Sequence, residues 1–296
     1  MAKKKKFTVT IAQGSGFCFG VQRAMKLAFE YADKNTDKGV YSLRQIIHNP
    51  QESARLEKAG ARHVESVDGI KKGGCAIIST HGITPAEETQ LRAKAADVLD
   101  TTCPYVKKIH KAVERLKDEG YQIIIVGDKV HYEVKGISGY AGDKGIVLNT
   151  AADVMKAHLE SRVGVVCQTT QSAEKFMEIA AAVMKKVLVG RYAEVRVFNT
   201  ICDATQKRQE ATMQLAKKSD LMIIVGGKNS ANTKRLYELS RGILKEVRHV
   251  ETAAEIKKEW LKGKTRIGIS AGASTPESAI KEIINKIKYM EQHDGK

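Results

Sequence analysis

The sequence predicts an α/β protein of three similar domains, each built around a small parallel sheet. Apolar runs with strand-like alternation are followed by amphipathic segments with helical spacing, again and again along the chain. This alternation is typical of parallel sheets, because parallel strands need a crossover connection. The alternation also falls into three copies, each with one cysteine at the same point. A repeat of this kind indicates one architecture used three times.

Three kinds of segment recur in order. The first is a strand-like run, a loop with one cysteine and a charged amphipathic helix, at residues 7–33, 97–120 and 193–220. The second is a strand and a polar loop that opens a helix, at residues 46–53, 126–136 and 225–235. The third is a strand whose loop ends in Ser, Thr or Pro before acidic residues, a helix-start signal, at residues 76–88, 163–175 and 267–278.

These copies place the domains at residues 7–98, 99–194 and 195–288, with a C-terminal tail at 289–296. Ligands of parallel α/β sheets gather beyond the carboxyl ends of the strands, which is where the polar loops of all three copies lie. If the three domains surround a pseudo-threefold axis, their cysteine loops converge at its centre.

Charge and hydropathy exclude several classes of protein. The 296 residues include 50 Lys and Arg against 34 Asp and Glu, a net charge of +16. No apolar run approaches the roughly 20 residues that span a bilayer, and the basic cluster Lys3 to Lys6 precedes no apolar segment of a signal peptide. We expect a cytoplasmic protein without a membrane partner. The charge admits nucleic acid, an anionic substrate or an acidic protein as partner.

Five cysteines in such a chain favour metal binding or reactivity over a disulfide framework. Cys75 and Cys167 lie in apolar runs, and we interpret them as buried structural residues. Cys18, Cys103 and Cys202 stand at equivalent strand-to-helix turns, where a helix N-terminus favours the thiolate. Three such thiolates fit a zinc site or an iron–sulfur cluster with one incompletely ligated iron, and their spacing alone leaves both open.

The polar loops carry hydrogen-bond donors that suit a phosphate or diphosphate. Histidines occur in three of these loops, as His48, His81 and His131. Hydroxyl and amide groups occupy the other loops, as Thr169, Ser230, Asn232 and Ser274. We expect the imidazolium groups to make this cavity cationic, with added preference for anions from the helix N-termini that open there.

Glu133 follows His131 by two residues and brings a carboxyl group into the same set of loops. In a dry cavity a carboxyl group keeps its proton to a higher pH than in water. We therefore interpret Glu133 as a candidate general acid.

The residues now resemble a known family, that of 4-hydroxy-3-methylbut-2-enyl diphosphate reductase, also called the LytB or IspH family. The resemblance covers essentially the whole chain and rests on separate loop motifs in the family's order. These motifs are GFCFGV, IIHN, THG, DTTCP, HYE, QTT, NTICDAT, VGGKNSANTKRL and AGASTP.

The resemblance implies a trefoil of three α/β domains around a 4Fe-4S cluster, with Cys18, Cys103 and Cys202 as ligands and one iron open to substrate. It implies a two-electron reduction with loss of water that yields isopentenyl and dimethylallyl diphosphates, the last step of the non-mevalonate isoprenoid route. Glu133 and Thr169 would deliver protons to the substrate hydroxyl, with His131 also catalytic. The substrate contacts implied are Thr169 and the diphosphate-binding His48, His81, His131, Ser230, Asn232 and Ser274.

Several positions depart from the family pattern without removing a cluster ligand or an acid. Tyr132 stands where Pro is common, and Ala231 replaces a frequent Ser, which removes one hydrogen bond worth about 1 kcal/mol. Phe19 stands where Ala is common, Glu52 where an apolar residue is usual, and Thr101 where Ala precedes Thr102.

Two other classes of function remain as alternatives. A cluster-bearing redox sensor or nucleic-acid-binding protein would use the positive charge, but aromatic residues make up only 5% of the chain and do not interleave with the basic ones. A zinc hydrolase would use the three cysteines with zinc in place of iron.

The positive charge is better explained by a protein partner. The histidines are counted as neutral in the +16, so most of the surplus lies outside the predicted cavity. We expect it to dock a small acidic electron carrier, a reduced ferredoxin or flavodoxin, and we expect no nucleic acid partner.

Overall fold

The protein is described by a computed structural model of residues 7–189 and 192–293. The basic cluster Lys3 to Lys6 lies outside these residues. The described chain contains three sheets of four strands each, and every strand pair in them is parallel. The predicted α/β class, with three similar small parallel sheets, is confirmed. Within the described residues no helix has the combination of length and apolar character needed to cross a membrane.

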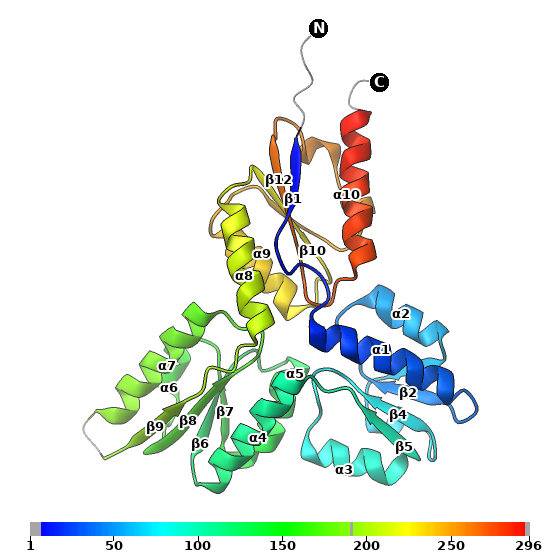
Figure 1. Cartoon of the computed structure of the whole chain (residues 1–296). Helices are drawn as coiled ribbons and strands as arrows, with labels where there is room; N and C mark the ends of the chain where they lie inside the picture. Colours follow the sequence, from blue (N-terminus) through cyan, green and yellow to red (C-terminus); the bar gives the residue numbers. More distant parts are fainter. Residues whose placement is uncertain (1–6, 190–191, 294–296) are drawn as a thin grey trace. The chain divides into compact units, whose positions relative to one another are not determined.

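The three sheets have the same order of strands, and Figure 1 labels most of these strands. One sheet runs β3 (Ala61–Val64), β2 (Val40–Leu43), β4 (Cys75–Ile78), β5 (Asp97–Asp100). The next runs β7 (Gly145–Leu148), β6 (Gln122–Val126), β8 (Arg162–Cys167), β9 (Glu194–Val197). The last runs β11 (Val247–Val250), β10 (Leu221–Val225), β12 (Arg266–Ala271), β1 (Thr8–Ile11).

The described chain has ten α-helices, nine of them between strands and α10 after the last strand. They are α1 (Phe19–Lys34), α2 (Pro50–Lys58), α3 (Pro85–Lys94), α4 (Pro104–Asp118), α5 (Tyr132–Ala141), α6 (Ala151–Lys156), α7 (Ala173–Leu188), α8 (Asp203–Ala216), α9 (Ala231–Arg241) and α10 (Glu277–Gln292). Short 3-10 turns lie at Val67–Gly69, Gly142–Lys144, Ala253–Glu255 and Lys258–Trp260.

The strand that leads into each cysteine is an edge strand of the sheet before it. β5 precedes Cys103 and pairs with β4, and β9 precedes Cys202 and pairs with β8. β1 precedes Cys18 and pairs with β12, with Thr8 opposite Arg266. The sheets therefore divide the chain at the cysteines, and β1 joins the sheet of residues 221–271 rather than the first one. Helix α10 also continues to Gln292, into the segment expected as a tail.

The chain forms two compact units. Of the described residues, unit 1 contains 7–19, the loop His48–Pro50 and 203–293, so it holds the sheet with β1. Unit 2 contains residues 20–47, 51–189 and 192–202, with the other two sheets. The expected boundaries at 7–98, 99–194 and 195–288 stay a prediction of where three domains separate.

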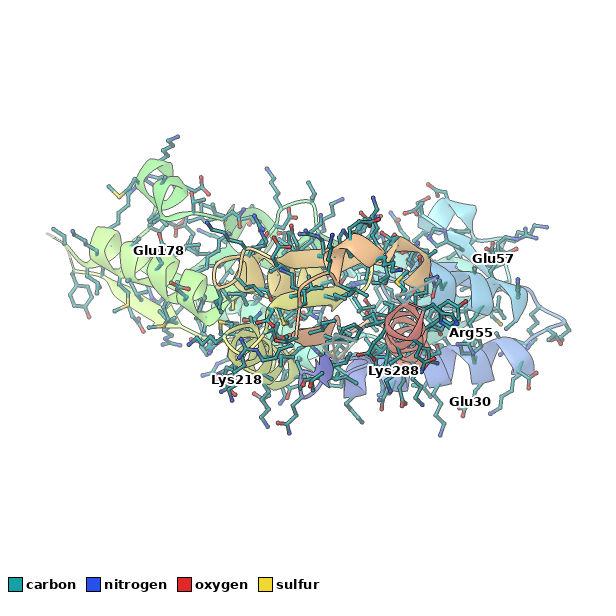
Figure 2. The ribbon with its side chains drawn as sticks, turned by 90° about the horizontal axis from the view of Figure 1, so that it is seen from above. Glu30, Arg55, Glu57, Glu178, Lys218 and Lys288 are labelled. Atoms are coloured by element: carbon teal, nitrogen blue, oxygen red, sulfur yellow. The ribbon has the colours of Figure 1, made fainter. Side chains whose placement is uncertain are left out.

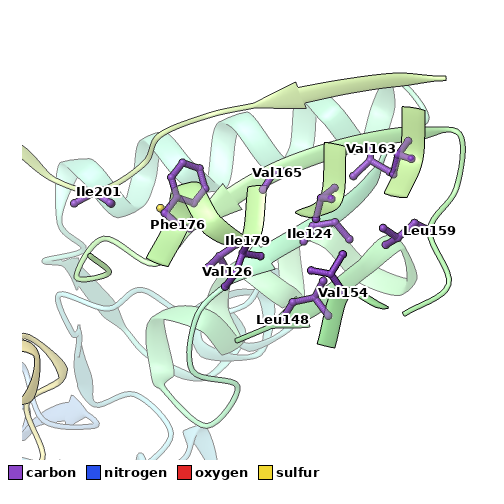
Figure 3. Packing of buried hydrophobic residues seen from close by; sticks show 13 residues of the cluster. Ile124, Val126, Leu148, Val154, Leu159, Val163, Val165, Phe176, Ile179 and Ile201 are labelled. Carbon is purple, nitrogen blue, oxygen red and sulfur yellow. The ribbon is translucent and has the colours of Figure 1, made fainter. Parts of the chain in front are cut away.

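The central strands are buried on both faces, as near-continuous apolar runs in parallel sheets require. In β6 the side chains of Ile124 and Val126 pack against α6 and α7, and Figure 3 shows them beside Phe176 and Ile179. The intervening Ile123 and Ile125 pack against α4 and α5 on the opposite face. Cys75 and Cys167 are fully buried in strands β4 and β8, as expected.

Candidate active site

Each of the three cysteines is held by a backbone hydrogen bond to a polar loop that the sequence predicts. In unit 2 the N–H of Cys103 donates to the carbonyl of Thr80 at 3.0 Å, and that of Cys202 to the carbonyl of Thr169 at 3.1 Å. In unit 1 the N–H of Cys18 donates to the carbonyl of Ala273 at 3.3 Å. The three acceptors lie in the loops that follow β4, β8 and β12. The equivalence of the cysteines therefore extends to their backbone contacts.

The three thiols share a chemical state as well as a position. None of them is in a disulfide, and each is partly accessible, whereas Cys75 and Cys167 are buried. Cys103 caps helix α4 with Pro104 as the first helical residue, an arrangement that presets the turn after the sulfur. Accessible thiols at helix starts have the chemistry of iron or zinc ligands. This donor set fits an iron–sulfur cluster.

Glu133 and Thr169 form a buried pair in unit 2. The hydroxyl of Thr169 lies 2.9 Å from Oε2 of Glu133, and the backbone N–H of Thr169 donates to Oε1 at 2.6 Å. The two side chains come from different elements. Glu133 is in the first turn of α5, and Thr169 is in the loop after β8. Only 3% of Glu133 is exposed, and burial raises the pKa of its carboxyl group to about 7 although both bonds from Thr169 oppose the rise.

This geometry places the proton of a neutral Glu133 on one oxygen. A backbone N–H can only donate, so Oε1 must stay an acceptor. The proton therefore resides on Oε2, next to the hydroxyl of Thr169. A hydroxyl that accepts this proton in a hydrogen bond still has its own hydrogen to donate onward. The pair can thus pass a proton from a buried acid to the end of β8.

Two predicted histidines lie together in the same unit. The rings of His81 and His131 are 5.4 Å apart, centre to centre, and nearly perpendicular. His131 caps helix α5, where its Nδ1 accepts the backbone N–H of Glu133 at 3.1 Å. In a neutral ring this bond puts the hydrogen on Nε2, which leaves Nε2 as a donor. His131 thereby links the acid to the histidine pair.

In unit 1 the loop of Ser274 contacts the loop His48–Pro50. The hydroxyl of Ser274 donates to the carbonyl of His48 at 3.1 Å, and Nδ2 of Asn49 donates to the carbonyl of Ser274 at 2.8 Å. A Cβ at Gly227 would lie 2.8 Å from the carbonyl oxygen of His48, so only glycine fits there. The loops that carry these residues are therefore packed backbone against backbone.

Burial lowers the pKa of His48, and the positive charge of Lys234 lowers it further. The expectation of a cationic imidazolium is therefore corrected at this position, because a pKa below the ordinary 6.5 favours the neutral ring of His48 at pH 7. The nearby cation is Lys234, a residue that the sequence analysis missed. Its signal in the sequence is its place in the motif VGGKNSANTKRL, two residues after Asn232.

Asn232 provides the sharpest indication of a ligand in unit 1. Only 4% of it is exposed, yet neither its amide nitrogen nor its amide oxygen has a hydrogen-bond partner in the described part of the chain. A buried amide without partners costs about 1–3 kcal/mol. Asn232 lies in the first turn of α9, which Ser230 caps through a bond from the N–H of Thr233 at 3.3 Å. A helix start with a free amide suits an anionic oxygen.

Two further buried polar residues flank the predicted ones. Gln168 is 2% exposed; its Oε1 accepts the backbone N–H of Asp128 at 3.2 Å, and its Nε2 lacks a partner among the described residues. Asn49 is 6% exposed and holds the loop of Ser274 as described above. Their only signal in the sequence is their position beside Thr169 and His48.

The positions that depart from the family pattern lie in different surroundings. The hydroxyl of Tyr132 donates to Oε2 of Glu65 at 3.1 Å, and the guanidinium of Arg44 lies 4.8 Å from the centre of its ring. Phe19 is 71% exposed at the start of α1. Glu52 is buried, and its Oε1 pairs with Nη1 of Arg55 at 2.8 Å. Ala231 is the first residue of α9 and leaves the cap by Ser230 intact.

The site residues thus fall into two sets, each joined within its own unit. Unit 2 brings together the backbone of Cys103 and Cys202 with the loops of its four other predicted residues, His81, His131, Glu133 and Thr169. In unit 1 the backbone of Cys18 contacts the loop that holds Ser274, and Ser274 in turn bonds to the backbone of His48. Ser230 and Asn232 lie together at the start of α9.

Comparison with models of known protein families assigns the chain to a family. The model of the LytB protein family matches residues 9–288. The chain belongs to the LytB family. The predicted resemblance is thereby confirmed over nearly the whole sequence.

Relatives of this LytB chain share a name. The 4-hydroxy-3-methylbut-2-enyl diphosphate reductase of Aquifex aeolicus (strain VF5) is 47% identical over 285 residues, 95% of this chain and 96% of that protein. The protein of the same name from Geobacter sp. (strain M21) is 45% identical over 285 residues, 96% of this chain and 98% of that protein.

Solved structures agree with the family. One, described as (E)-4-hydroxy-3-methyl-but-2-enyl diphosphate reductase and as the terminal enzyme of the non-mevalonate pathway, is 46% identical. It superposes with a TM-score of 0.69 over 95% of this chain and 99% of its own. The E-1-hydroxy-2-methyl-but-2-enyl-4-diphosphate reductase of Plasmodium falciparum is 30% identical, with a TM-score of 0.86 over 95% of this chain and 87% of its own.

Proposed function

We propose that this LytB chain reduces (E)-4-hydroxy-3-methylbut-2-enyl diphosphate to isopentenyl and dimethylallyl diphosphates, with loss of the hydroxyl group as water. The reaction takes two electrons and is the last step of the non-mevalonate isoprenoid route. The observation that carries the proposal is the buried Glu133–Thr169 pair, an acid with a pKa of about 7 whose partner loop also holds Cys202. Full-length relatives named for this reaction support it.

Cys18, Cys103 and Cys202 are the proposed ligands of a 4Fe-4S cluster with one iron open to substrate. Their equivalent placement and accessible thiols support this choice, and their convergence on one cluster at the centre of a trefoil remains part of the proposal. When bound, the cluster would supply electrons and a Lewis acid for the departing oxygen. The chain's own residues must supply the proton and hold the substrate.

We infer that hydrogen-bond donors of the predicted polar loops hold the diphosphate. Asn232 offers a buried amide without a partner in the described chain, and Ser230 offers a hydroxyl hydrogen. Ser274 would turn its hydroxyl hydrogen from the carbonyl of His48 to the diphosphate. His131 presents Nε2–H because its Nδ1 is an acceptor, and His81 lies beside it. Arrival of an anion raises the pKa of the neutral His48 and so draws in a proton. These contacts would fix the substrate at one end and leave its hydroxyl at the other.

Proton delivery follows from the Glu133–Thr169 geometry. Oε2 of Glu133 releases its proton to the hydroxyl of Thr169, which passes its own hydrogen to the departing oxygen. The remaining carboxylate keeps the bond from the Thr169 backbone N–H, which stabilises the charge that develops. Gln168 beside this loop carries a second buried amide that fits a polar group of the substrate.

The electron donor in this proposal is a reduced ferredoxin or flavodoxin in the cytoplasm. The chain's net charge of +16 supports an acidic partner. Helix α4 begins directly after Cys103 and exposes Lys107, Lys108 and Lys111 in its first two turns. A carrier docked there would be close to a cluster ligand.

The proposal is tested by anaerobic purification, quantification of iron and sulfide, and a turnover assay with the diphosphate substrate and a reduced donor. We expect about four irons and four sulfides per chain, following the cluster type, and both products. Cys103→Ser should lose the visible absorption of the cluster and the turnover, whereas Cys75→Ala should keep both. Zinc without sulfide, or full turnover of the Cys103 variant, would overturn the cluster assignment.

A further inference from the structure

We propose that the outer face of helix α7 pairs with the same face of a second copy of this chain, in an antiparallel arrangement. The inner face of α7 packs on the sheet through Phe176, Ile179 and Val183, all nearly fully buried. The outer face carries a second, narrower apolar stripe, which is exposed. Met177 is 63% exposed, Met184 42% and Leu188 45%, and Ala181 between them is also exposed.

These exposed residues have the spacing of a coiled-coil seam. Met177, Ala181, Met184 and Leu188 are separated by four, three and four residues, the spacing of alternating d and a positions in a heptad. The seam is about 17 Å long, at 1.5 Å per helical residue. A surface helix needs only one apolar stripe to pack on its own sheet. The second stripe on α7 therefore indicates a partner helix.

Charge beside the seam selects the partner and its direction. Glu178 and Lys185 occupy the two e positions and are both exposed, and neither makes an ion pair in the described part of the chain. Figure 2 labels Glu178 on this helix. In an antiparallel pair the e positions of the two helices face each other, so each Glu178 meets the Lys185 of the other copy. In a parallel pair the e positions would meet g positions, which are Ala180 and Val187 and carry no charge.

Side-chain size fits the same antiparallel register. The twofold axis that joins Glu178 to Lys185 also sets Ala181 opposite Met184, and Met177 opposite Leu188. A small residue thus faces a large one in the two central layers, which lets the helices approach closely. Because one surface meets its own copy about a twofold axis, the contact is closed and produces a dimer rather than a filament.

The size of the contact sets its strength. One helix per chain covers less than the roughly 1,200–2,000 Å² that stable interfaces bury. We therefore expect a reversible dimer with a dissociation constant on the order of 100 µM, dependent on protein concentration. The flexible thioethers of Met177 and Met184 suit a face that must also remain soluble when unpaired.

The experiment is sedimentation velocity of the intact holoenzyme over a series of protein concentrations. The wild-type chain should shift from monomer to dimer, and Met184→Lys should stay monomeric. Glu178→Lys and Lys185→Glu should each weaken the dimer at least about tenfold, and the double exchange should restore it. Glu57→Lys on α2, an exposed site with the same change of charge, is the matched control and should leave the dimer unchanged.

Turnover at low concentration should be equal in all these variants, because none of them touches the proposed site. A wild-type chain that stays monomeric throughout the series would overturn the proposal. So would a dimer that Met184→Lys leaves intact. If each single charge exchange weakens the dimer but the double exchange does not restore it, the antiparallel register is wrong.

Discussion

Glu133 shows how burial and one backbone donor assign a role to a single side chain. The carboxyl group is 3% exposed, and its bond from the Thr169 N–H fixes Oε1 as the acceptor. Sequence alone places Glu133 near His131, but the burial that raises its pKa depends on packing between α5 and the loop after β8. The candidate could be predicted from the sequence, whereas the direction of its proton could not.

Replacement of Glu133 by Gln tests this direction. The amide oxygen can take the place of Oε1 and the amide nitrogen can donate to the Thr169 hydroxyl, so the fold of the loop is kept while the transferable proton is lost. We expect kcat to fall by about 100-fold or more, the usual range for removal of a general acid, with substrate affinity nearly unchanged. Single-turnover kinetics and a binding titration separate the two effects. A variant with wild-type kcat would remove Glu133 from the acid role.

The pH dependence of turnover follows from the same group. Burial raises the pKa of Glu133 to about 7, so the acid is protonated below this pH and loses its proton above it. We expect turnover to decline as pH rises through about 7, and this decline to be absent in Glu133→Gln. Stability follows the same sign, because the folded chain binds the extra proton between the ordinary pKa of 4.5 and about 7 and so loses stability as pH rises through that window. Turnover that is level across this range would contradict the assignment.

At the scale of elements, the loop from β4 to α3 is shaped by the packing behind it. Gly82 has a φ of +73°, and a Cβ there would lie 2.8 Å from Cε1 of His110 on α4. His110 is buried and stacks on Tyr140 of α5 with ring centres 4.1 Å apart. The loop that presents His81 therefore rests on both helices that begin at site residues.

Gly82→Ala tests this packing. The left-handed φ costs about 1 kcal/mol for a residue with a Cβ, and the close contact with His110 adds to it. We expect a lower melting temperature by calorimetry and a raised KM, because the loop of His81 must shift. Gly60→Ala, at a φ of +100° with open space around it, is the control and should lower stability without changing KM.

Element types could largely be predicted from the sequence, because apolar alternation and helix-start residues are local signals. Thr84, for example, forms the expected cap of α3 together with Glu87. Sheet membership could not be predicted in the same way. The run at 8–11 has the same pattern whether it pairs with β2 or with β12, and only long-range pairing decides between them.

At the scale of the whole molecule, the net positive charge affects association with a protein partner more than it affects the fold. Lys and Arg together outnumber Asp and Glu by 16, and exposed lysines such as Lys107 and Lys108 lie beside the start of α4. Opposite charges on an acidic electron carrier would speed association by steering.

Salt should therefore slow reduction by the carrier. We expect the second-order rate of reduction by ferredoxin or flavodoxin to fall by about tenfold or more between low and physiological ionic strength, because steering is screened beyond about 8–10 Å. Reduction by dithionite provides the comparison that reports the site itself. Lys108→Glu should slow only the reaction with the protein donor. Rates that are indifferent to salt would argue against electrostatic docking.

The pairing of β1 with β12 also bears on the order in which the chain folds. Thr8 lies opposite Arg266, so β1 is made before the strands of unit 2 and its partner strand after them. During synthesis both sheets of unit 2 can form while β1 still lacks the strand beside which it belongs. Unit 1 therefore closes late, when residues 266–271 leave the ribosome, and the turn that carries Cys18 takes its final form only then. The long sequence separation of this contact makes it a slow step.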